Sequence, residues 1–109
     1  MALWRSIRQK LNGTDPRDWS TETATIDIVT VIRQEELKGR EIIVTYLASL
    51  TYFYRKPDLQ TGDYYRVFEE WEEPTAQSWA ASHKGRTVQV HVDPGDPTRS
   101  VLLDEDLSD

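Results

Sequence analysis

The sequence has no cysteine, and several other features that often reveal a function are missing as well. Without thiols the chain can form neither a disulfide nor a cysteine-ligated zinc site, which fits a reducing compartment. No apolar run approaches the roughly 18–20 residues that cross a bilayer, and the N-terminal residues lack the apolar segment and cleavage site of a secretory signal. We therefore expect a cytoplasmic protein without a transmembrane span, which contacts the inner membrane surface at most peripherally.

Positive charge is scarce, because 19 acidic residues outnumber 13 basic ones and give a formal net charge of −6 over 109 residues. This balance argues against binding to nucleic acid by phosphate neutralisation. It leaves open an acidic inhibitor or immunity-type protein that binds a basic partner. The hydrophobic fraction is only 38%, but four Trp, five Tyr and two Phe supply large side chains for the core of one domain.

The N-terminal segment, residues 1–12, predicts a short amphipathic helix, and a linker follows up to residue 20. Its apolar side chains share one face, and its basic side chains occupy the flanks without acidic neighbours. Such a helix can dock on the domain's own sheet or on a second copy, or it can contact anionic lipid weakly, at about 1 kcal/mol per basic residue. The residues concerned are Leu3, Trp4, Ile7 and Leu11 on the apolar face, and Arg5, Arg8 and Lys10 beside it.

Residues 21–103 predict a single domain of the α+β class that is mainly β. Segments rich in β-branched and aromatic residues indicate strands over 21–33, 41–54, 63–71, 86–93 and 100–103. In the first strand the apolar positions change parity between Ile28 and Val29, which indicates a β-bulge or burial on both faces. A helix over 74–84 starts at Pro74 and ends before Gly85.

These elements predict a curved antiparallel sheet or partial barrel of about five strands, with one helix between the third and fourth strands. A meander is the simplest topology for such a sheet. Residues 104–109 form an acidic tail, which we expect to fray.

The last third of the domain contains a recurrent pattern: a glycine, a V-x-V strand, a D-P-x-x-P turn and an S-x-L strand. It resembles the C-terminal signature of a bacterial family of small β-rich domains, domain of unknown function 3592. The resemblance extends over residues 21–103 and implies no activity and no catalytic residue. Many members have transmembrane helices beside the domain, where this chain has its basic N-terminal segment. The pattern consists here of Gly85, Val88, Val90, Asp93, Pro94, Pro97, Ser100 and Leu102.

Residue types suited to catalysis are few. His83 and His91 are the only histidines, and the spacing of Asp93 after His91 provides no complete zinc site. No glycine-rich phosphate loop is present either. Strand alternation predicts His91 on the solvent side, opposite the inward Val88, Val90 and Val92. We therefore expect no metal, no cofactor and no enzyme activity, with a small-ligand pocket or active site near His91 as the alternative.

The leading hypothesis is a non-catalytic module for protein interaction or self-association, with a membrane-peripheral variant. Aromatic residues cluster in two neighbouring strands, and alternation leaves about half of such rings for an exposed patch. Together with the N-terminal segment, they form the candidate interaction surface: Trp4, Arg5, Ile7, Arg8, Tyr52, Tyr54, Tyr64 and Tyr65.

Overall fold

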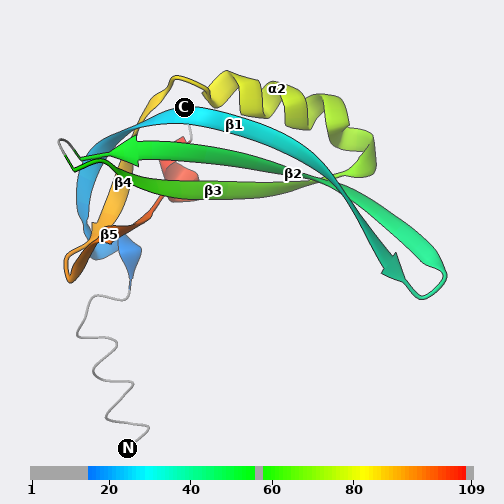
Figure 1. Ribbon diagram of the computed structural model, residues 1–109, viewed down its shortest axis with the longest axis horizontal. Helices are drawn as coiled ribbons and strands as arrows, with labels where there is room; N and C mark the ends of the chain where they lie inside the picture. The colour runs from blue at the N-terminus through cyan, green and yellow to red at the C-terminus, as the bar shows by residue number, and fades with distance from the viewer. Residues whose placement is uncertain (1–14, 56–57, 108–109) are drawn as a thin grey trace, which may run out of the picture.

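Five antiparallel strands form one strongly curved sheet in the computed structural model, which describes residues 15–55 and 58–107 (Figure 1). The predicted class is confirmed: the fold is mainly β, with one α-helix between the third and fourth strands. The predicted N-terminal helix lies outside the described residues. The elements in chain order are η1 Pro16–Asp18, β1 Ser20–Lys38, β2 Glu41–Tyr54, β3 Gln60–Glu69, η2 Glu70–Glu72, α2 Glu73–His83, β4 Thr87–Asp93, β5 Asp96–Val101 and η3 Asp104–Leu107.

The hairpin of β1 and β2 is the longest feature of the sheet. The register of β1 shifts between Ile26 and Ile28, so Asp27 forms a bulge. The predicted bulge is thus confirmed, but it lies before Ile28 and not after it, and Ile28 is 48% exposed. Strand β1 extends beyond the predicted end at Arg33 to Lys38, because its polar last residues stay paired with the start of β2. Gly39 in the connecting turn has φ +63°, a backbone conformation that favours glycine.

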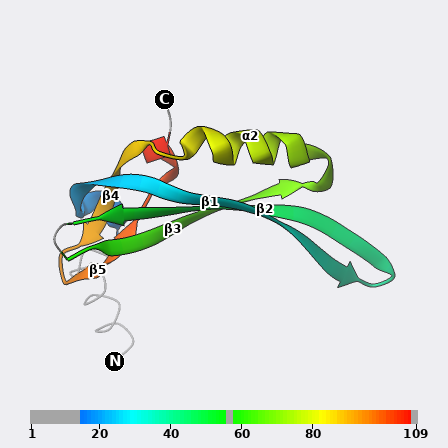
Figure 2. The same ribbon diagram turned by 45° about the horizontal axis from the view of Figure 1, so that its top comes forward.

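The strand order is β3-β2-β1-β4-β5, so the meander prediction holds for the first three strands and is wrong for the fourth. Helix α2 runs lengthwise along β1 and β2, and the chain then enters β4 on the far side of β1 (Figure 2). Its 11 residues span about 16 Å in the direction of the strands and bring the chain back to β1 near Ile26. Two hydrogen bonds hold the segment after α2 against β1: the Gly85 amide donates to Ile26 O at 2.7 Å, and the Ile26 amide donates to Arg86 O at 2.9 Å.

One face of the sheet holds the core, and we call it the inner face. Tyr52 and Tyr54 on β2 are nearly fully buried there, and their hydroxyls reach β5. Tyr52 Oη lies 2.7 Å from Ser100 Oγ, and Tyr54 donates to Pro97 O at 2.9 Å. These contacts draw β5 towards β2 and β3, so the sheet curls into a nearly closed barrel. The buried inner-face residues also include Ala24, Ile26, Leu50, Val88, Val90, Val92, Leu102 and Leu107, and, under α2, Tyr46, Ala48 and Phe68.

The start of the acidic C-terminal segment does not fray, contrary to the prediction. Asp104–Leu107 forms η3, and each of its residues has a contact with another element. Tyr64 donates to Asp104, Arg17 Nε donates to Glu105 at 3.1 Å, and His91 Nε2 lies 3.1 Å from Asp106 Oδ2. Leu107 packs in the core. The acidic composition suggested a solvated tail, but one leucine and three specific partners fold it.

Candidate binding groove at the edge of β3

Strand β3 has a strand neighbour on one side only, among the residues that the structure describes, and we call its other side the free edge. Near Gly62 the edge lies under the ring of Tyr52, which extends over the glycine towards Ser100 on β5. Further along, at residues 64–67, α2 and η3 stand on either side of a space. The free edge is therefore closed at one end and opens into a groove at the other.

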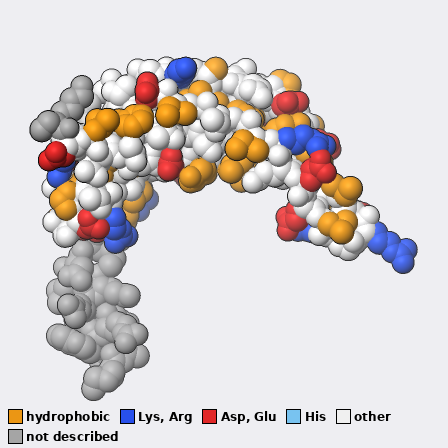
Figure 3. Space-filling view, viewed as in Figure 1, with side chains coloured by type: hydrophobic (Ala, Val, Ile, Leu, Met, Phe, Trp, Pro, Cys, Tyr) orange, Lys and Arg blue, Asp and Glu red, His pale blue; other side chains and the backbone are white. Residues whose placement is uncertain are grey.

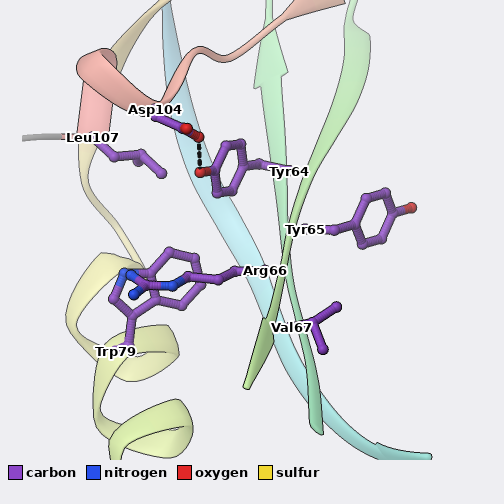
Figure 4. Close-up of a pocket in the computed structure, with 7 residues that line it drawn as sticks. All are labelled: Tyr64, Tyr65, Arg66, Val67, Trp79, Asp104 and Leu107. Carbon is purple, nitrogen blue, oxygen red and sulfur yellow. Dashed lines mark hydrogen bonds between the residues drawn. The ribbon is translucent and has the colours of Figure 1, made fainter. Parts of the chain in front are cut away.

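The groove has a volume of about 620 Å³ and is lined by both polar and apolar side chains. Four consecutive β3 residues line it, which places it along the edge of the strand, because neighbouring side chains point to opposite faces. In Figure 4 Tyr64 and Arg66 point towards η3 and α2, whereas Tyr65 and Val67 point the other way. The lining residues are Tyr64, Tyr65, Arg66, Val67, Trp79, Asp104 and Leu107.

Trp79 of α2 forms one wall, and its position is fixed by aromatic neighbours. Its ring centroid lies 5.8 Å from that of Phe68, 6.2 Å from that of Tyr64 and 4.8 Å from that of His83, the last in a T-shaped contact. Arg66 lies against this wall, with its guanidinium carbon 5.6 Å from the Trp79 ring centroid. Cation–π contact of this kind holds the side chain without consuming its hydrogen-bond donors.

Arg66 is exposed, and the described residues provide it with no carboxylate within ion-pair distance. The nearest acid of the groove, Asp104, instead accepts a hydrogen bond from Tyr64. Burial and the Asp104 carboxylate raise the pKa of Tyr64 to about 12, although the Arg66 charge opposes this shift. The phenol therefore stays protonated and keeps Asp104 occupied, so the Arg66 guanidinium is available for a bound carboxylate.

The outer face of the sheet next to the groove is apolar and exposed. Val67 is 60% exposed, and the cross-strand row beside it continues through Leu47 on β2 to Ile32 on β1, which is 52% exposed. Tyr65, two residues before Val67, is 57% exposed. Figure 3 shows hydrophobic side chains along the hollowed side of the molecule. Solvent-accessible apolar surface thus lies on both faces of the sheet along the β3 edge.

His91 does not lie in this groove. It was predicted on the solvent side of β4 but is only 8% exposed, because Asp106 of η3 covers it. Its Nδ1 is buried without a hydrogen-bond partner among the described residues. The described residues also contain no group of three or more His, Cys, Asp or Glu placed to hold a metal ion. His91 therefore serves to hold η3, one wall of the groove.

The residues of the predicted interaction surface fall into three groups in the structure. Tyr52 and Tyr54 are 0% and 2% exposed, so they belong to the core and not to a surface. Tyr64 and Tyr65 line the groove. Trp4, Arg5, Ile7 and Arg8 lie outside the described residues.

The predicted surface set lacks five of the seven residues that line the groove: Arg66, Val67, Trp79, Asp104 and Leu107. Arg66 and Trp79 are 13 positions apart and meet only through the path of α2, and Leu107 arrives from the far end of the chain. One signal was available for Arg66, since an arginine inside an aromatic strand segment is a candidate for cation–π contact.

Among the residues that the structure describes, no helix is both long enough and apolar enough to cross a membrane. A comparison with protein families finds one whose model, described as Domain of unknown function (DUF3592), matches residues 22–106. No curated protein and no solved structure matches the chain significantly.

Proposed function

The chain belongs to the DUF3592 family, and we propose that it is a non-catalytic protein-interaction module that binds an extended segment of a partner along the free edge of β3. The observation that supports this proposal is the groove at residues 64–67, where an unpaired strand edge lies open between α2 and η3. Addition of a strand to such an edge supplies affinity through main-chain hydrogen bonds.

Side-chain pockets would supply specificity, because successive residues of an added strand point to opposite faces. On the inner face, the groove offers the guanidinium of Arg66 and the apolar surfaces of Trp79 and Leu107. A segment with a carboxylate next to Arg66 and an aliphatic or aromatic side chain two positions away fits this face. On the outer face, apolar side chains of the segment would cover Tyr65 and Val67, both now more than half exposed.

The proposal is tested by selecting peptides from a displayed random library on the immobilised protein. Selected sequences should combine an acidic residue with apolar residues at alternate positions. Their affinity for the Arg66→Glu variant should fall at least about tenfold, because a charge pair becomes a repulsion. The matched control is Lys84→Glu, a charge reversal at an exposed residue directly after α2 that does not line the groove, which should leave affinity unchanged.

Hydrogen exchange locates the bound segment independently. A bound peptide should slow exchange of the amides of residues 64–67 that point to the free edge. Failure to enrich any peptide, or enriched peptides that bind Arg66→Glu as well as the wild type, would contradict the proposal.

A further inference from the structure

A second unpaired edge lies on the opposite side of β2, in what we call the arm: residues 28–38 of β1 with their partners, residues 41–51 of β2. Strand β4 pairs with β1 only at residues 20–25, and Ile26 is bonded to Gly85 and Arg86. From residue 28 to residue 38, β1 has β2 on one side and no described strand on the other. Figure 1 shows the end of the arm, around the turn between β1 and β2, extending away from the body of the molecule.

The arm has apolar residues that nothing described here covers. Leu37 and Ile42, opposite each other near the tip, are 70% and 63% exposed, and Ile32 is 52% exposed. At the end of the arm, residues 35–38 and 41–44 form a two-stranded ribbon without β3, and such ribbons are marginally stable alone. A long unpaired edge with apolar side chains readily pairs with another strand. In Figure 3 the far end of the arm shows hydrophobic side chains beside acidic and basic ones. A strand that pairs with this edge must therefore place opposite charges against them.

We infer that the arm pairs with the arm of a second copy of this chain, β1 against β1, antiparallel about a two-fold axis through Gln34. In that register Arg33 lies opposite Glu35 of the second copy, and by symmetry Glu35 lies opposite its Arg33. Val31 lies opposite Leu37 of the second copy. The exposed Leu37 near the tip thus packs against Val31, which is half-buried beside the core residues under α2. The self-opposed Gln34 has both a donor and an acceptor in its side chain and can bond to its own copy.

The pairing geometry leaves few other registers. A two-fold axis across an antiparallel pair always sets one residue opposite itself, and like charges directly opposite are destabilising. An axis through Arg33, Glu35 or Glu36 therefore opposes like charges. An axis through Ile32 would bring Lys38 of the second copy opposite Ile26, where Gly85 and Arg86 already occupy the edge.

The Gln34 register instead ends with Lys38 opposite Thr30. The paired stretch, residues 30–38, thus stops short of the bulge at Asp27 and of the Gly85 and Arg86 contacts. Within one chain Arg33 and Glu35 already form an ion pair, and both side chains are half exposed. In the pair of copies, each of them faces its opposite charge across the new ladder.

Charge reversal tests the inference on the full chain. Arg33→Glu and Glu35→Arg should each weaken self-association at least about tenfold in analytical ultracentrifugation, because two symmetry-related attractions become repulsions. Mixing these two variants should restore association as a heterodimer, since each then presents the charges that the other needs. A change of fold within one chain cannot produce that rescue. Lys84→Glu and Glu70→Arg, exposed reversals outside the arm, are the matched controls.

Cysteine cross-linking tests the register, because the chain has no native thiol. Gln34→Cys should form an intermolecular disulfide under mild oxidation, whereas Ser78→Cys on the exposed side of α2 should not. A chain that stays monomeric up to its solubility limit would overturn the inference. So would a dimer that is insensitive to both reversals, or one that cross-links through Ser78→Cys and not through Gln34→Cys.

Discussion

Gly62→Ala is the substitution for which the structure predicts the clearest loss of stability. A Cβ built at Gly62 overlaps the hydroxyl oxygen and Cζ of Tyr52 and lies 2.7 Å from its Cε1. The ring cannot simply move aside, because Tyr52 is 0% exposed, packs against Tyr54 at 6.1 Å and bonds to Ser100. Either β3 shifts away from β2 or Tyr52 leaves its hydrogen bond.

The magnitude follows from three contributions. Overpacking a core site costs about 1–3 kcal/mol, and the lost hydrogen bond between Tyr52 and Ser100 costs about 0.5–1.5 kcal/mol. Replacement of glycine returns about 0.4–1 kcal/mol, because the unfolded chain becomes less flexible. The net loss is about 2 kcal/mol, within a range of about 0.5–4 kcal/mol, and a loss of about 2 kcal/mol lowers the melting temperature of a chain of this length by roughly 10 °C.

Urea and thermal unfolding measure the loss, with Gly95→Ala as the matched control. Gly95 has no left-handed φ, and its nearest contact to an added Cβ is Asp93 Oδ1 at 3.5 Å, so that change should stay within about 0.5 kcal/mol. In a double-mutant cycle, Tyr52→Leu should remove most of the cost of Gly62→Ala. If Gly62→Ala and Gly95→Ala unfold together, Tyr52 does not occupy the space above the glycine.

Three further predictions follow from the groove and its surroundings. The Tyr64 pKa is raised from 10.0 to about 12, so the protonated phenol contributes its full stability below pH 10 and loses it as the pH rises through about 12. The difference in free energy of unfolding between wild type and Tyr64→Phe should therefore shrink over that interval. A constant difference would contradict the contact with Asp104. His91→Phe keeps a buried ring but removes the imidazole partner of Asp106, whose carboxylate keeps only the Leu103 amide, so the variant should lose about 1–3 kcal/mol of stability. It should also speed hydrogen exchange of the Asp106 amide, and equal protection would disprove the role of His91 in holding η3. Trp71 is 78% exposed, so Trp71→Ala should change the free energy of unfolding by no more than about 0.5 kcal/mol in urea.

Local sequence pattern predicted the elements whose burial alternates along the strand. Strand β2 has the predicted bounds, and the inward positions of β4 are Val88, Val90 and Val92, as expected. The parity change between Ile28 and Val29 indicated a bulge in β1, which the structure has slightly earlier, at Asp27. These features depend on neighbours two positions apart, which the sequence displays directly.

Long-range pairing was beyond the reach of the same pattern. The polar residues 33–36 contain no alternation, so the extension of β1 to Lys38 depends on its pairing with β2. The position of β4 beside β1 depends on the path of α2 and on Ile26 meeting Gly85 and Arg86. The groove needs both, because Trp79 and Leu107 reach Arg66 only after the sheet has curled.

The two proposed surfaces are compatible because they lie on opposite sides of β2. Pairing of two arms through β1 builds a continuous sheet in the order β3-β2-β1-β1-β2-β3, with the axis perpendicular to it. Both α2 helices then lie on the same face, and both β3 edges remain at the outer ends with their grooves unblocked. A dimer of this form presents two identical sites, so a partner with two suitable segments binds with an avidity that can exceed the single-site affinity by about 10²–10⁴-fold when its linker spans them. The arm would thus serve binding without contacting the ligand, which gives a functional reason for a strand that continues so far beyond the core.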